Sequence, residues 1–398
     1  MTTRSPDLAS YWPLDPGVVF LNHGSFGACP RPVLEAQQHF RDQLERDPVH
    51  FMVRELEPLL DEARRDLAAF VGVEPIHLAF VPNTTTGINT VLRSLPFRPQ
   101  DQLLTTTHAY NACRNALDFV AQQTGAQVVV AKVPFPIDSP KRVVEAVLEA
   151  VTPNTRLAVL DHVTSQTGLI FPIEELVREL QARGIETLVD GAHAPGMLPL
   201  RLNAIGATYY VANCHKWLCA PKGAGFLYTS PERRSDIRPL SISHGANSTR
   251  SDRSRFHLEF DWTGTDDPSA YLCVPAAIRF LGSLLPGGWP DVFARNRALA
   301  LDARQYLCDQ LNLSPPCPDD MVGTLASLLI PSSARGTRGE PFSRDPLQDA
   351  LYWRFRIEVA ITVWPSPPGR LLRLSAHLYN DRGQYSRLAQ ALAELLAS

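Results

Sequence analysis

The chain contains four lysines, Lys132, Lys141, Lys216 and Lys222. One of them, Lys216, is predicted to lie at the end of a β-strand. Lys216 follows directly on the apolar segment TYYVANC, which predicts a β-strand. Ligands of open α/β sheets gather at the carboxyl ends of the strands, so this lysine is a candidate for catalysis. Lys132 and Lys141 flank a proline-rich loop and Lys222 lies in the turn PKGAG, so a surface role fits these three better.

A carboxylate closes a second apolar strand. Asp190 ends the segment IETLVD and is expected at the same sheet edge as Lys216. An unpaired buried carboxylate is costly, and a protonated pyridine nitrogen would relieve that cost and keep the ring an electron sink. His193, three residues further on, could then bond to an oxygen on that ring. Taken singly, either residue also fits an ordinary polar group at a strand end.

The segment NTTTGIN, residues 83 to 89, lies between the predicted strand HLAFVP and a helix. Threonine hydroxyls and free backbone N–H groups at a helix N-terminus form an anion site. A simple helix cap explains the segment equally well when it is taken alone. Together with Lys216 and Asp190, a phosphate-bearing cofactor becomes the better explanation.

The elements that must position these residues alternate between helix and strand from about residue 33 onwards. The strands are uniformly apolar, which predicts an α/β fold with helices on both faces of the sheet. Beyond about residue 272, long helices followed by short strands predict a smaller α+β domain. We expect a large cofactor-binding domain over 20–271, a small domain formed by 1–19 plus 272–398, and a mobile insertion at PSSARGTRGEPFSRD, residues 331–345.

Composition excludes several classes of protein. The chain of 398 residues has no apolar run of spanning or signal-peptide length, so we expect a cytoplasmic protein without membrane contact. With 38 basic and 41 acidic residues and no basic block among aromatics, nucleic acid is not an expected partner. The seven cysteines are scattered without a Cys-x-x-Cys pair, which favours reduced buried thiols over disulfides or a metal site.

These motifs resemble class V of the aminotransferase superfamily, fold type I pyridoxal-phosphate enzymes, and within it the isopenicillin N epimerase-like group. The resemblance extends from LNHGSFGA to RLSAHLYN, and its most specific part is VDGAHAPG followed by ANCHKW. It implies a mostly parallel sheet of the seven-stranded type sandwiched by helices, pyridoxal 5'-phosphate as cofactor, and a homodimer with active sites at the interface.

The resemblance also assigns the groups around the cofactor ring. Lys216 would carry the cofactor as a Schiff base, and Asp190 would pair with the pyridine nitrogen. Tyr110 in HAYNA would stack on the ring, while His193 and Ser165, the latter in HVTSQTG, would approach the ring oxygen.

The phosphate would be bound by residues from three segments. Thr84 and Thr85 belong to NTTTGIN, and His215 precedes the lysine. Asn213 stands where many relatives have a phosphate-binding serine, a departure from the family pattern. Thr265 in DWTGTDD would reach the phosphate of the partner subunit.

The substrate is expected to be an amino acid. Arg373 in LLRLSAHLYN matches the arginine that binds its carboxylate, a task for a planar bidentate donor. Asn22 and His23 in LNHGS would line the same pocket.

The reaction expected from the resemblance begins when Lys216, released by the substrate amine, removes the α proton. Reprotonation from the opposite face gives epimerisation, which is the leading expectation. The alternative is a carbon–sulfur β-lyase acting on a cysteine conjugate or sulfoxide, as in ergothioneine-type pathways. A cofactor-binding protein without turnover is the alternative from another class, and the presence of Lys216, Asp190 and Arg373 argues against it.

The stretch EVAITVWPSPPGRLLR before Arg373 lacks the cysteine that desulfurase relatives carry there, which disfavours persulfide chemistry. Trp364 in that stretch indicates either an apolar wall for a large substrate side chain or plain packing.

Overall fold

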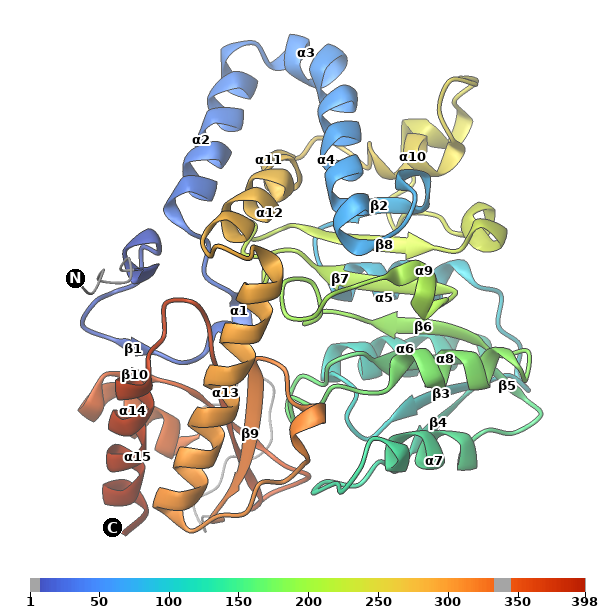
Figure 1. Ribbon diagram of the computed structural model, residues 1–398. Helices are drawn as coiled ribbons and strands as arrows, with labels where there is room; N and C mark the ends of the chain where they lie inside the picture. Colours follow the sequence, from blue (N-terminus) through green and yellow to red (C-terminus); the bar gives the residue numbers. More distant parts are fainter. Residues whose placement is uncertain (1–7, 333–344, 398) are drawn as a thin grey trace.

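A computed structural model describes residues 8–332 and 345–397, and its centre is a seven-stranded sheet (Figure 1). The strand order is β2-β8-β7-β6-β5-β3-β4. All neighbours run parallel except at β8, which is antiparallel to both β7 and β2. The strands are β2 (Leu78–Val81), β3 (Gln102–Thr106), β4 (Gln127–Ala131), β5 (Thr155–Asp161), β6 (Glu186–Asp190), β7 (Tyr209–Asn213) and β8 (Gly225–Thr229).

The sheet is covered on both faces. Along β5, Leu157 and Val159 belong to one apolar cluster and Ala158 and Leu160 to another, as the alternation of side chains across a strand requires. Because both faces are buried, the strands are apolar throughout. The first cluster includes α5 (Thr84–Ser94), α6 (Asn111–Thr124) and α10 (Arg255–Phe260); the second includes α4 (Leu56–Val71), α7 (Lys141–Glu149), α8 (Ile173–Gln181) and α9 (Leu202–Ile205).

Local sequence explains the helices that border the site. In α8, Ile173, Leu176, Val177 and Leu180 are buried, which is the spacing of an amphipathic helix on a sheet. Helix α5 begins after Asn83, whose side chain accepts a hydrogen bond from the backbone N–H of Thr86. The threonine-rich first turn is thereby held at the sheet edge.

The C-terminal part contains a three-stranded antiparallel sheet in the order β11-β12-β9. Strand β1 (Val19–Phe20) pairs with β10 (Ile357–Glu358) and so joins the start of the chain to this part. The remaining elements are β9 (Leu325–Ile330), β11 (Ala360–Val363), β12 (Arg370–Ser375), α13 (Trp289–Leu311), α14 (Pro346–Phe355) and α15 (Arg382–Ala397). The division into 20–271 and 1–19 plus 272–398 stays a proposal.

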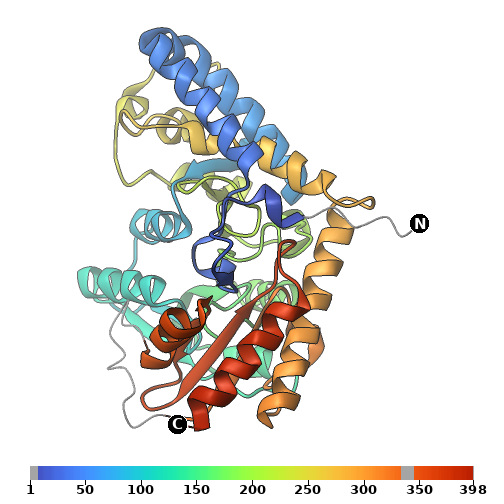
Figure 2. The ribbon, with the colours of Figure 1, turned by 90° about the vertical axis from the view of Figure 1, so that its left-hand side faces the viewer.

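Helix α2 (Arg31–Arg46) and α4 form a long antiparallel pair that projects from one end of the molecule, opposite the C-terminal helices (Figure 2). They are joined by α3 (Pro48–His50) and a π-helical turn at Phe51–Glu55. Two further short helices are α1 (His23–Phe26) and α11 (Ser269–Leu272). The longer helix α12 (Val274–Ser283) follows α11.

The expected α/β fold with a mostly parallel sheet between helices is confirmed, together with a small C-terminal sheet. The segment 331–345, expected to be a mobile insertion, lies almost wholly outside the described residues. Within the described ranges no helix is long and apolar enough to cross a membrane.

Candidate active site

A cavity of about 650 Å³ opens at the carboxyl ends of β5, β6 and β7, where the last residues are Asp161, Asp190 and Asn213. This edge is where an α/β sheet is expected to bind a ligand. The cavity brings together nine of the residues predicted from sequence: Thr84, Thr85, Tyr110, Ser165, Asp190, His193, Asn213, His215 and Lys216.

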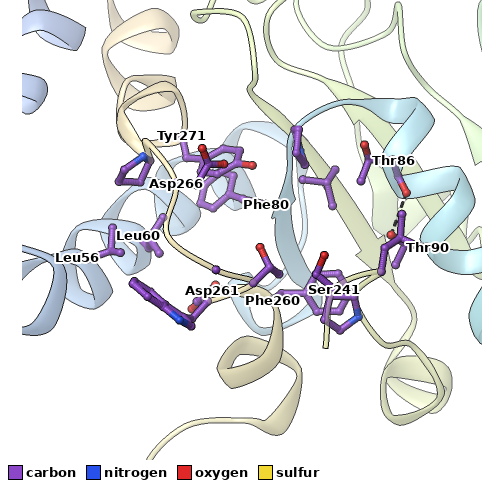
Figure 3. A pocket seen from close by; sticks show the side chains of 18 of the residues that line it. Leu56, Leu60, Phe80, Thr86, Thr90, Ser241, Phe260, Asp261, Asp266 and Tyr271 are labelled. Carbon is purple, nitrogen blue, oxygen red and sulfur yellow. Dashed lines mark hydrogen bonds between the residues drawn. The ribbon is translucent and has the colours of Figure 1, made fainter. Parts of the chain in front are cut away.

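A larger cavity of about 970 Å³ lies between α4, β2 and the loop after α10 (Figure 3). Its lining is mostly apolar, and it contains no lysine. The buried carboxylate that faces it, Asp261, already accepts hydrogen bonds from Arg64 and Arg253. With this carboxylate paired and the other lining carboxylate, Asp266, exposed to solvent, this cavity offers less chemistry than the smaller one.

Lys216 is partly buried, three residues beyond the end of β7. Its Nζ lies 3.1 Å from Nε2 of His193. Burial, and secondarily the nearby Arg373, lower the pKa of Lys216 to about 8. A lysine with this pKa supplies an appreciable fraction of free amine near neutral pH, as a nucleophile or a general base requires.

Asp190 lies beside a second carboxyl group. Its Oδ1 accepts from the backbone N–H of Ala192 at 2.9 Å, and its Oδ2 accepts from the Cys113 thiol at 3.1 Å. Asp161 is its register partner on β5. Burial raises the pKa of both carboxyl groups, and the charge of Asp190 raises that of Asp161 further. Two such neighbours do not both ionise readily, so Asp161 holds a proton while Asp190 is free to pair with a cation.

The first turn of α5 faces the same cavity. The side chain of Asn213 accepts from the backbone N–H of Thr84 at 2.9 Å and so acts as a second cap of this helix. The hydroxyl oxygen of Thr84 is buried, and within the described residues it has no hydrogen-bond partner. A buried hydroxyl without a partner is costly, and an anion at the helix N-terminus would supply the missing bond.

His215 is oriented by a backbone carbonyl. Its Nδ1 is 2.9 Å from the carbonyl oxygen of Ala224, so Nδ1 carries the proton and donates it. Burial lowers the pKa of His215 to about 4, which leaves Nε2 unprotonated. Donation from Nε2 to a phosphate therefore requires the uptake of a proton.

Arg373 is a buried cation on β12. Its guanidinium donates to the carbonyl oxygen of Ser165 at 2.6 Å and to the hydroxyl of Ser25 at 2.8 Å. Its Nε has no partner, and no carboxylate among residues 8–332 and 345–397 forms an ion pair with it. Burial lowers its pKa to about 10. An uncompensated buried guanidinium fits an anionic ligand such as a carboxylate.

Asn22 and His23 occupy different environments. The Asn22 side chain lies against Arg373, and its Oδ1 accepts from Ser25 at 2.6 Å. His23 is fully buried behind the pocket rather than in its lining. Its Nε2 donates to the carbonyl oxygen of Lys216 at 3.1 Å, and its Nδ1 accepts from the Tyr379 hydroxyl at 2.8 Å.

His23 also belongs to a buried group with Cys219 and His377, whose potential metal-binding atoms lie within 4.8 Å of one another. The two imidazole rings are stacked, with centroids 4.2 Å apart and planes 21° apart. An imidazole binds a metal along a lone pair in its own ring plane, and these two planes do not converge on one point at metal–nitrogen distances. We interpret the group as packing.

Thr265 is exposed on the loop after α10, beside the larger cavity, and is not brought to the Lys216 pocket of its own chain. Trp364 packs against His108 and Phe135, with ring centroids 4.6 and 5.9 Å away, and does not line the pocket. For Trp364 this favours plain packing over a substrate wall.

Several residues of the pocket were missed from sequence. Asp161 closes the apolar strand RLAVLD in the same way as Asp190 closes IETLVD, so the same signal could have identified it. Cys113 and Ser25 carried no such signal, because their contacts to Asp190 and Arg373 join residues far apart in the chain. The Cys113 thiol stays protonated, since burial and Asp190 raise its pKa well above the usual value.

The pocket fits the expected cofactor. Thr84 offers an unused hydroxyl at a helix N-terminus, Asp190 offers a buried carboxylate, and Lys216 offers an amine of lowered pKa. These three groups match a phosphate, a ring nitrogen and an aldehyde carbon.

Comparisons with known proteins agree with this geometry. Residues 19–301 match the family model described as Aminotransferase class-V. The isopenicillin N epimerase of Streptomyces clavuligerus is 37% identical over 96% of both chains. A probable chloroplastic L-cysteine desulfhydrase of Arabidopsis thaliana is 27% identical over 96% of this chain and 84% of its own. A solved structure of a C-DES mutant, with glycine covalently linked to its PLP cofactor, superposes with a TM-score of 0.80 at 22% identity, over 97% of this chain and 98% of its own. On the extent of these matches, the chain belongs to the class V aminotransferase family.

Proposed function

We propose that this protein is a pyridoxal 5'-phosphate enzyme that acts at Cα of an amino acid, with Lys216 binding the cofactor as a Schiff base. The observation that carries the proposal is Arg373, a buried guanidinium without a carboxylate partner among the described residues, beside a pocket that contains Lys216 and Asp190. The family match and the epimerase and desulfhydrase relatives support the same class of chemistry.

The residues divide the work by position. When bound, the cofactor supplies an electron sink that acidifies the α proton. Thr84, Thr85 and His215 bind the phosphate, and Asp190 keeps the ring nitrogen protonated. Arg373 orients the substrate carboxylate, and the amine of Lys216 accepts the α proton.

The epimerase-like reaction is our leading proposal, because a relative with 37% identity over nearly the whole chain is an isopenicillin N epimerase. Incubating candidate amino acids in deuterium oxide tests it. Epimerisation leaves an intact, α-deuterated amino acid of inverted configuration. A keto acid, with the cofactor converted to its amine form, would instead indicate transamination.

A carbon–sulfur β-lyase is the second candidate, favoured by the desulfhydrase relative. In the same incubation this reaction releases pyruvate, ammonia and a sulfur product. Persulfide chemistry is disfavoured, because the one thiol that lines the pocket in the described part of the chain, Cys113, is bonded to Asp190 and protonated.

Borohydride reduction of the yellow holoenzyme followed by peptide mapping tests the lysine. We expect the adduct on Lys216, and Lys216→Ala should abolish α-deuterium exchange. An adduct on Lys132, Lys141 or Lys222 would refute the site, and wild-type exchange in Lys216→Ala would assign the base to another residue.

The proposal includes a cytoplasmic homodimer. Thr265 is exposed and does not line the Lys216 pocket of its own chain, as expected of a residue that serves a partner subunit. Phe26 at the pocket has 69% of its surface exposed, which suits a mouth covered by a second chain. The seven cysteines are all free and buried, as in a reducing compartment. Sedimentation equilibrium of the holoenzyme tests the dimer.

A further inference from the structure

A buried indole lies directly behind the histidine that contacts Lys216. Nε1 of Trp217 is 3.2 Å from Nδ1 of His193, and Nε2 of His193 is 3.1 Å from Nζ of Lys216. Both ring nitrogens of His193 thus have a partner, which defines the orientation of its ring. Trp217 and Lys216 are neighbours in the chain, and their side chains contact the two nitrogens of the same imidazole ring.

The position of the imidazole proton follows from the types of the partners. An indole N–H can only donate a hydrogen bond, so Nδ1 of His193 must accept. A neutral imidazole has one proton, which therefore resides on Nε2 and points toward Lys216. Nζ of Lys216 then accepts this bond, which only the uncharged amine can do.

The charges around the pair favour the neutral forms. Burial, then any positive charge on Lys216 and the charge of Arg373, lower the pKa of His193 well below its usual value. Around Lys216, burial and Arg373 favour the free amine, whereas the carboxylate of Asp190 favours the ammonium form. The hydrogen bond that Nε2–H of His193 donates to Nζ of Lys216 further stabilises the free amine.

Trp217 has little freedom to leave this position. Its side chain is 1% exposed, and its ring packs on His23 with centroids 4.9 Å apart. A Cβ atom at Gly196 would lie 2.4 Å from the Trp217 backbone, and one at Gly24 would lie 3.3 Å from its ring. Close packing on these sides holds the indole N–H toward His193.

We propose that Trp217 is a positioning residue that fixes His193 with its proton on Nε2 and so keeps the amine of Lys216 an acceptor. The proposal rests on the proposed role of Lys216 as the amine that binds the cofactor and takes the α proton. The same Nε2–H is the group that His193 would present to an oxygen of the cofactor ring. Without the indole, the proton can move to Nδ1, and Nε2 then accepts from a protonated Lys216.

Nitrogen-15 NMR of histidine-labelled protein tests the tautomer directly. In the parent holoenzyme and in the protein stripped of cofactor, we expect His193 to show a protonated Nε2 and an unprotonated Nδ1, assigned by the signal lost in His193→Gln. In Trp217→Phe this signature should be lost or mixed. A parent signal with the proton on Nδ1, or an unchanged signal in Trp217→Phe, would overturn the proposal, and the parent measurement decides even if the variant does not fold.

The rate of cofactor uptake by the stripped protein as a function of pH is the second readout. Because a charge-assisted bond to Nε2 would stabilise the ammonium form, the midpoint for Lys216 should rise by about one pH unit in Trp217→Phe. The same substitution in a His193→Gln background should leave the midpoint unchanged. An equal rise in both backgrounds would make Trp217 a packing residue only.

Trp289→Phe is the matched control, since Nε1 of Trp289 donates to the carbonyl oxygen of Ile278 at 3.1 Å, away from the pocket. It should alter neither readout. Failure of the borohydride mapping on Lys216 would refute the proposed function, while the NMR measurement would still decide the tautomer.

Discussion

Replacing Arg373 by lysine separates the binding of substrate from the binding of cofactor. The guanidinium already uses three N–H groups for Ser165, Ser25 and, at 3.4 Å, Asn22, so its Nε–H and one further N–H are left for a ligand. A lysine retains the charge but concentrates its donors at one atom. It cannot serve the three protein acceptors and both oxygens of a carboxylate together.

The expected loss follows from the hydrogen bonds removed. A hydrogen bond to a charged group contributes about 1.5–3 kcal/mol, and about 1.4 kcal/mol corresponds to a tenfold change. Losing one of the two bonds to the carboxylate should therefore lower kcat/KM by roughly 10- to 100-fold, mainly through KM. Cofactor affinity and the absorbance spectrum should stay unchanged, because Arg373 does not line the cofactor pocket.

The assay is steady-state kinetics with the best amino-acid substrate, together with cofactor titration of both proteins. Arg370→Lys is the matched control, because Arg370 is on the same strand and equally buried but pairs with Asp345 through Nε and an amino group, each at 2.9 Å. The control should lose thermal stability and keep its KM. Equal loss of cofactor and of kcat/KM in Arg373→Lys would show that Arg373 is structural.

Three further predictions concern the cofactor side. Asp190→Asn should weaken the electron sink and lower kcat at least 100-fold. Asp161→Asn should change kcat less than fivefold, because the carboxyl group of Asp161 is already protonated. Similar losses of kcat in both variants would contradict the assignment of this proton to Asp161. Thr84→Val should raise the dissociation constant for pyridoxal phosphate about tenfold in equilibrium titrations without reducing thermal stability, since its hydroxyl has no partner among the described residues. Cofactor binding should take up a proton at His215, because its pKa of about 4 in the ligand-free protein must rise beside a phosphate. Cofactor affinity should therefore fall as the pH rises from about 4 to the higher pKa of His215 in the bound state. Calorimetry in buffers of different ionisation enthalpy should find this uptake in the parent protein and not in His215→Gln.

Local sequence rules identified the groups at the sheet edge. Lys216, Asp190 and Thr84 each follow or close an apolar strand, and the carboxyl ends of parallel strands meet at one edge whatever their order. The alternation of apolar segments likewise predicted the strands from β2 to β8 and the helices α5 to α8, because each depends on side chains a few positions apart, but it did not predict the short α9. Helix α4 was not predicted, although its buried residues follow helical spacing.

The contacts that set the chemistry of these groups were decided only by the tertiary structure. Asp161 faces Asp190 because β5 lies beside β6 in the sheet, and Cys113 reaches Asp190 from a helix 77 residues earlier. The side chain of Asn213 caps α5. The imidazole of His23 lies behind the pocket because it is hydrogen-bonded to the Tyr379 hydroxyl and to the carbonyl oxygen of Lys216. Residue types and spacing determine which elements form and where polar side chains emerge from them, since both follow from short-range backbone geometry. Which charges share a buried space, and hence which one keeps its proton, depends on strand order and on side-chain directions that only the packed chain defines.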